Sequence, residues 1–155
     1  METKVTSLSK EDLINLFATA TYGSEAIEVT IHPHSKKLAI GDNKDEKIAN
    51  VLLKGGDIEI TDLYSEEPKG NADHYGSNHI FVHWKAFEVD KHFSEEQGKW
   101  GHMVYTINLQ NILRGINKSQ EAKDYAYTLF DTKDGDYYTA YNLIQLIVFG
   151  EEVYG

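Results

Sequence analysis

Histidine is the residue type whose spacing in this chain comes closest to supporting chemistry. Five of the seven histidines fall between His74 and His102, and His79 and His83 are four residues apart. On a helix, that spacing would place both imidazoles on one face, where they could hold a metal ion. The residues between them are instead β-branched and aromatic, and in a strand the two rings would lie about 13 Å apart. The pattern favours ordinary strand and loop histidines, and we predict no metal site.

The sequence contains none of the common motifs of catalysis or phosphate binding. It has no cysteine, no nucleophile elbow around a serine and no glycine-rich phosphate loop. Its adjacent acids, such as Glu66 and Glu67, lie in polar segments where nothing would raise the pKa of a general acid. We therefore predict a protein without catalytic residues and without a cofactor.

The distribution of charge is more informative. The chain has 25 acidic and 15 basic residues, a net charge of −10, and residues 119–155 alone carry seven acids and two bases. Fourteen of the cations are lysine and only Arg114 is arginine, whereas phosphate and base recognition favour arginine. Such a chain should repel nucleic acids and anionic membranes, so we predict that it binds neither directly.

Tyrosines are interleaved with these C-terminal acids. Five of the ten tyrosines lie between Tyr125 and Tyr141. Helical spacing predicts that Tyr125 and Tyr141 are buried and that Tyr127 and Tyr137 face outward. Carboxylates steer association with a basic protein, and exposed aromatic side chains supply affinity, so this pattern favours a protein-binding surface. A solvated acidic surface that binds no partner would have the same composition. The candidate contacts are Asp124, Tyr127, Asp131, Asp134, Asp136 and Tyr137, with Glu66 and Glu67 as a second choice.

Periodicity predicts one α+β domain over residues 1–155, with about four mostly antiparallel strands and about five helices. Ser9 and Asn108 are expected to cap helices, Gly150 to end one, and residues 108–150 to form a helical C-terminal part. Residues 64–78 and 90–101 read as polar loops, the first of them flexible, and residues 151–155 as a tail or a last strand. The expected helices span 9–20, 44–54, 109–118, 119–130 and 137–149, and the expected strands 26–31, 57–64, 79–84 and 102–109.

No apolar run approaches the roughly 20 residues that span a bilayer, and the N-terminus is too polar for a signal peptide. We expect a cytoplasmic protein.

Three segments carry a family resemblance: FATATYGSEAIEV, ANVLLKGGDIEITDLY and YTAYNLIQLIVFGEEVYG, together about a third of the chain. They resemble small acidic proteins encoded by phages and mobile elements of low-GC Gram-positive bacteria, including anti-CRISPR and related counter-defence proteins. The resemblance implies an inhibitor in the host bacterium's cytoplasm that covers the basic nucleic-acid channel of a CRISPR nuclease or similar defence protein.

Two other functions stay open. Strand pairing could bring His79, His83 and His102 together in a metalloprotein or hydrolase. Alternatively, the apolar segment 137–150 could mediate self-association of a phage structural or regulatory protein as a homodimer.

Overall fold

The computed structural model describes residues 4–22, 25–70, 72–86 and 101–154. The expected loop at 90–101 lies outside these ranges except for Gly101.

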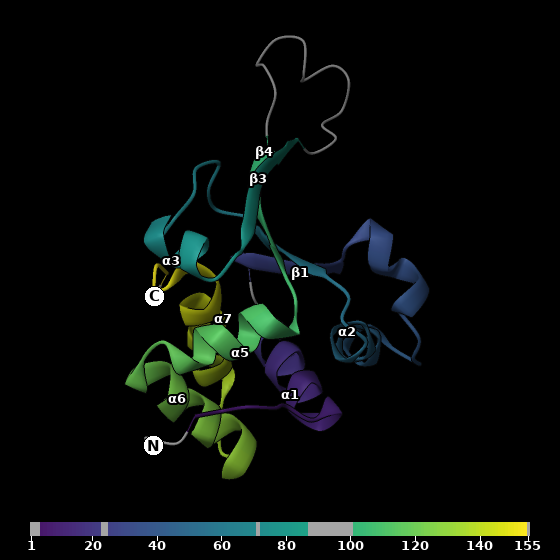
Figure 1. The fold of residues 1–155 in the computed structure, drawn as a ribbon, viewed down its shortest axis with the longest axis vertical. Coiled ribbons are helices and arrows are strands. Elements are labelled where there is room, and N and C mark those ends of the chain that lie inside the picture. The colour runs from purple at the N-terminus through teal and green to yellow at the C-terminus, as the bar shows by residue number, and fades with distance from the viewer. Residues whose placement is uncertain (1–3, 23–24, 71, 87–100, 155) are drawn as a thin grey trace.

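A four-stranded antiparallel sheet forms one layer of the fold (Figure 1). Its strands are β1 (Ile27–Ile31), β2 (Ile58–Asp62), β3 (Phe81–Ala86) and β4 (Gly101–Ile107), and they lie in the order β1-β2-β4-β3. The register pairs Val29 with Ile60, and Ile60 with Tyr105, so these three side chains share the face that packs into the hydrophobic core. The predicted α+β class and antiparallel sheet are confirmed.

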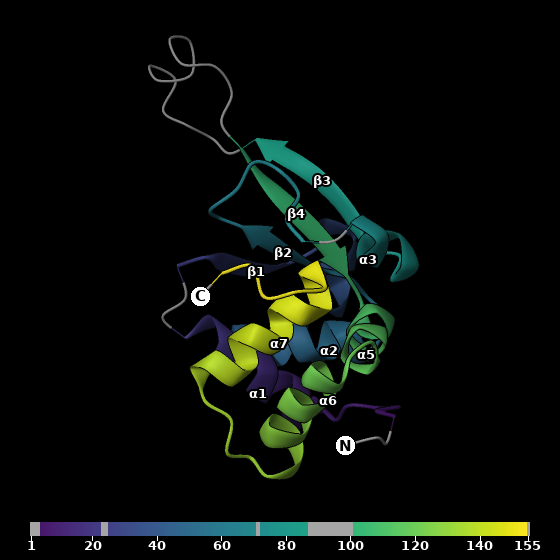
Figure 2. The same cartoon turned by 90° about the vertical axis from the view of Figure 1, so that its left-hand side faces the viewer.

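Helices cover this core face of the sheet, and the most apolar of them lies at the centre (Figures 1 and 2). Nine of the thirteen residues of the last helix are buried, and it contacts helices from both halves of the chain. The helices of seven or more residues are α1 (Lys10–Thr21), α2 (Lys44–Leu53), α5 (Leu109–Asn117), α6 (Gln120–Ala126) and α7 (Tyr137–Phe149). Two short helical segments, η1 (Pro33–Leu38, 3-10) and η2 (Tyr127–Asp131, π), complete this set together with α3 (Ala72–Ser77).

The expected helix ends are confirmed. The Ser9 side chain accepts a hydrogen bond from the Asp12 amide, and the Asp12 carboxylate accepts one from the Ser9 amide, which makes a full capping box. Asn108 caps α5 in the same reciprocal way with Asn111. Gly150 ends α7 in the left-handed conformation that glycine adopts without strain.

The prediction of a loop over residues 64–78 is wrong in its second half, where α3 forms. His74 is buried, and its Nε2 donates a hydrogen bond to the carbonyl of Ile147 on α7 at 2.7 Å. Burial lowers the pKa of His74. Asn78 is buried beside α5, and its side chain donates to the carbonyl of Asn111 at 3.0 Å. The polar composition that predicted a loop instead satisfies buried backbone groups of distant helices.

A buried carboxylate holds the C-terminal tail against the sheet. Asp62 is fully buried at the end of β2, and both of its oxygens accept from the Tyr154 hydroxyl, at 2.9 and 2.7 Å. The amide of Tyr64 also donates to Asp62, and the side chain of Gln145 on α7 bonds the backbone of Val153 and Tyr154. The tail is therefore irregular but anchored, and no strand forms in its described residues.

We expect Tyr154→Phe to destabilise the protein by about 2 kcal/mol, because it removes hydrogen bonds to a buried charge. Urea denaturation measures the change. Tyr22→Phe is the matched control, since Tyr22 is 84% exposed. Equal stability of the two variants would show that the tail contact contributes nothing.

Burial raises the pKa of Asp62 above its ordinary value of 3.8, against the opposing effect of the Tyr154 hydrogen bond. The folded protein therefore binds a proton at Asp62 more readily than the unfolded chain, and ionised Asp62 lowers stability at neutral pH. We expect the free energy of unfolding of the wild type, relative to Asp62→Asn, to increase as the pH falls from 7 towards 4. Urea denaturation across this range tests the sign, and a difference that stays constant or decreases contradicts it.

Candidate functional site

The five candidates Asp124, Tyr127, Asp131, Asp134 and Asp136 lie along one stretch of chain that turns at one end of the molecule. This stretch runs from α6 through η2 into the start of α7 (Figure 2). All five side chains are exposed. We call this group the acidic end.

A π-helix shapes the acidic end. The sequence predicted a continuous helix over 119–130, but α6 ends at Ala126 and η2 continues with a wider turn to Asp131. The amide of Thr132 donates to the carbonyl of Tyr127 at 3.1 Å, five residues back. Leu129 remains buried while Tyr127 and Asp131 are exposed on either side of it. Such π-turns occur mostly as single turns and are frequent at functional sites.

The aspartates of the turn are not neutralised by the protein's own cations. In the described ranges, no Lys or Arg nitrogen lies within ion-pair distance of Asp131, Asp134 or Asp136. The Asp136 carboxylate instead caps α7, accepting from the amide and the hydroxyl of Thr139 at 3.0 Å each. These hydrogen bonds lower the pKa of Asp136. Asp124 accepts a hydrogen bond from the Gln120 side chain at 2.8 Å.

The tyrosines divide between surface and core differently from the prediction. Tyr127 is exposed as expected, but Tyr137 is half-buried and stacks on the buried Tyr141, with ring centroids 5.4 Å apart. Tyr125 is only half-buried, and its hydroxyl donates to Glu152 at 3.0 Å. The exposed aromatic that sequence reasoning missed is Tyr138, at 63% exposure. Helical spacing did not indicate its exposure, because residues three apart share a helix face and Tyr138 precedes the buried Tyr141 by three.

A small pocket of about 180 Å³ adjoins the acidic end. Leu8, Ala126 and Phe130 give it apolar walls, while Tyr127 and Asp131 also line it. Lys4 and Lys123 line the same pocket. Because Asp12 also lines the pocket, its lining carries two carboxylates and two ammonium groups, and these charges balance.

The second-choice residues do not belong to this surface. Glu66 and Glu67 lie between β2 and α3, a segment that Figure 2 shows far from α6. The Glu66 carboxylate accepts a hydrogen bond from the amide of Gly101 at 2.9 Å, at the start of β4. Glu66 therefore links the β2–α3 connection to the sheet. The side chain of Glu67 forms no hydrogen bond or ion pair with another described residue.

The strand interpretation is confirmed for His83 and is wrong for His79, because β3 begins at Phe81. His83 on β3 and His102 on β4 share one face of the sheet, whereas His79 precedes β3 in a left-handed backbone conformation. His34 pairs with Asp57 at 2.7 Å. In the part of the chain that the structure describes, no three His, Asp or Glu side chains come together in a way that could hold a metal ion.

Comparison with family models, curated proteins and solved structures finds no match to this chain. The resemblance to counter-defence proteins therefore stays a prediction. None of the described helices is long and apolar enough to cross a membrane.

Asp136 contributes a negative charge to the surface and also caps α7, and substitutions can separate these two roles. Asn caps helices as well as Asp does, whereas Ala does not. We expect Asp136→Ala to lower the melting temperature and Asp136→Asn to leave it nearly unchanged, as followed by circular dichroism. If the two variants melt together, the Thr139 contacts do not stabilise α7.

Proposed function

We propose that this chain is a non-enzymatic binding protein whose acidic end docks on a basic surface of a partner protein. The observation that carries the proposal is the group of exposed aspartates on the turn, which no described cation neutralises and which Tyr127 and Tyr138 flank.

Physical chemistry gives each part of this surface a separate task. The unpaired carboxylates raise the rate of encounter with a positively charged surface, an effect that salt weakens. The exposed tyrosine rings supply rigid contact area, which is the usual source of affinity in protein interfaces. Because the turn is held between α6 and a capped α7, it needs little ordering on binding.

The finer proposal concerns the partner, and it combines this surface with the family resemblance. A protein channel that holds nucleic acid is lined with cations, and an acidic protein can occupy it in place of the phosphate backbone. We therefore propose a nuclease of a bacterial defence complex, such as a CRISPR nuclease, as the partner, and the cytoplasm of the host bacterium as the location.

Affinity capture from a nuclease-treated lysate of a low-GC Gram-positive bacterium would supply the partner without bridging nucleic acid. The decisive measurement is then the affinity of the purified partner for the variant Asp131→Lys, Asp134→Lys, Asp136→Asn. The third substitution keeps the α7 cap while removing its charge. We expect at least about tenfold weaker binding than the wild type in 50 mM NaCl, and a smaller loss of affinity on raising the salt to 300 mM.

The matched control changes the net charge equally at sites away from the acidic end: Asp42→Lys, Glu25→Lys, Asp45→Asn. This control should bind like the wild type if the acidic end is the contact. If both variants lose affinity for the partner equally, the loss is due to net charge alone. If neither variant loses affinity, the acidic end is not the binding site. The nuclease proposal fails separately if the captured partner still binds its nucleic acid when saturated with this protein.

A further inference from the structure

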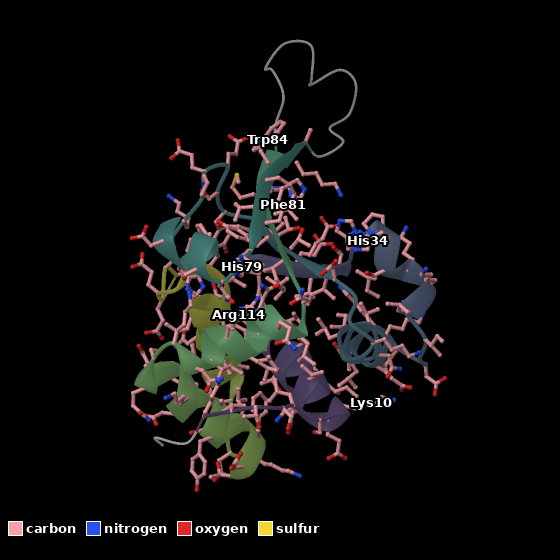
Figure 3. The ribbon with its side chains drawn as sticks, in the orientation of Figure 1. Lys10, His34, His79, Phe81, Trp84 and Arg114 are labelled. Carbon is pink, nitrogen blue, oxygen red and sulfur yellow. The ribbon has the colours of Figure 1, made fainter. Side chains whose placement is uncertain are left out.

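The face of the sheet opposite the hydrophobic core forms a second candidate site, independent of the acidic end. The register places alternate residues of all four strands on it, and we call this set the open face. Val104, at its centre, is 2% exposed yet is not part of the core cluster. Figure 3 labels Phe81, which stands on this face and stacks on His83. The open face comprises Glu28, Thr30, Glu59, Thr61, Phe81, His83, Lys85, His102, Val104 and Thr106.

The open face is hollowed. A cavity of about 520 Å³ lies over it, within the range of roughly 300–1,000 Å³ typical of small-ligand sites. Its lining includes Glu28 and Thr30 from β1, Thr61 from β2, and Lys85 from β3. Hydroxyl, carboxylate and ammonium groups therefore surround one space.

Opposite charges stand on opposite sides of this cavity. Glu28 lines the cavity from β1, at one edge of the sheet, whereas Glu59 on β2 lies outside the lining. Lys85 lies on β3, at the other edge, paired with His102. Between described residues, none of Glu28, Glu59 and Lys85 makes an ion pair. A ligand that complements the cavity must carry a cation at the β1 side and an anion at the β3 side.

The open face also holds polar groups that the protein does not satisfy. The Nδ1 atom of His83 on β3 is buried, and no described residue forms a hydrogen bond with it. The Thr106 hydroxyl on the neighbouring strand is likewise buried without a partner. Buried polar groups in folded proteins are nearly always hydrogen-bonded, so these two atoms are open to a hydrogen bond from a ligand.

Strand spacing sets the length of that ligand. β1 and β3 are separated by three strand spacings of about 4.8 Å, roughly 14 Å in all. The row of Glu28 ends at His83 on β3, and Lys85 is two residues further along, so the Cα atoms of Glu28 and Lys85 lie about 16 Å apart. Extended toward each other, the two side chains would leave about 10 Å between their charges. An extended peptide covers at most about 3.6 Å per residue, so three residues span the gap.

We propose that the open face binds a short zwitterionic peptide of about three residues. Its amino group pairs with Glu28, and its carboxylate pairs with Lys85. The threonines between them bond the peptide backbone.

Trialanine is the probe, and ¹⁵N-HSQC titration of the whole protein is the measurement. We expect saturable shifts at the amides of β1, β2 and β4, with N-acetyl-trialanine and trialanine amide each binding about three- to fivefold more weakly. Glu28→Gln should weaken the binding of trialanine to the same degree. It should leave the binding of N-acetyl-trialanine unchanged, because that peptide has no amino group to pair with Glu28. Lys85→Gln should do the same for the amidated peptide.

Glu25→Gln and Lys54→Gln are the controls, since they remove equivalent charges from exposed positions outside the open face. The spectra themselves report whether each variant is folded. The proposal is overturned if trialanine shifts no open-face amide, if the blocked peptides bind as well as trialanine, or if the Glu28 and Lys85 variants behave like the controls. None of these outcomes bears on the partner of the acidic end.

Discussion

The contact between the buried carboxylate of Asp62 and the hydroxyl of Tyr154 is the constraint on which the arrangement of the C-terminal half depends. A carboxylate in the core is costly unless it is hydrogen-bonded, and Asp62 obtains its bonds from Tyr154 and from the amide of Tyr64. Tyr154 can reach it only if the chain turns back after α7 at Gly150. The same turn lets Gln145 bond the returning backbone. The polar centre of the core thus fixes where α7 ends.

Fixing one end of α7 also fixes the other. Its buried residues lock it against α1, α5 and α6, so its first turn cannot shift independently of the core. The acidic end begins where Asp136 caps that turn, about 20 Å from Gly150 at 1.5 Å per helical residue. The surface charges are therefore carried by a short turn that is held between η2 and the packed helix α7. A preorganised surface loses less entropy on binding, which is why the position of α7 matters to the proposed function.

Local pattern predicted the elements, because strand alternation and helical stripes act over a few residues. Asp62 shares the core face of β2 with Ile58 and Ile60, but nothing nearby in the sequence indicates its partner 92 residues away. The helix α3 was missed for the same reason. Its His74 is explained by a carbonyl on α7, 73 residues distant. For the candidate site, composition predicted the exposed aspartates correctly, while the π-turn and the stacking of Tyr137 on Tyr141 arise only from tertiary packing.

Glu59 and Asp62 show that burial alone does not define the role of a carboxylate. They lie on opposite faces of β2, and both are at most 5% exposed. Asp62 faces the core, where two tyrosines donate to it, and these bonds position the C-terminal tail although the ionised carboxylate lowers stability at neutral pH. Glu59 lies on the opposite face of β2, where no described residue donates to its carboxylate, and neither of its oxygens is among the buried atoms without a partner. Its charge is therefore met by solvent, whereas that of Asp62 is met by the protein, and only Asp62 can position another segment of the chain.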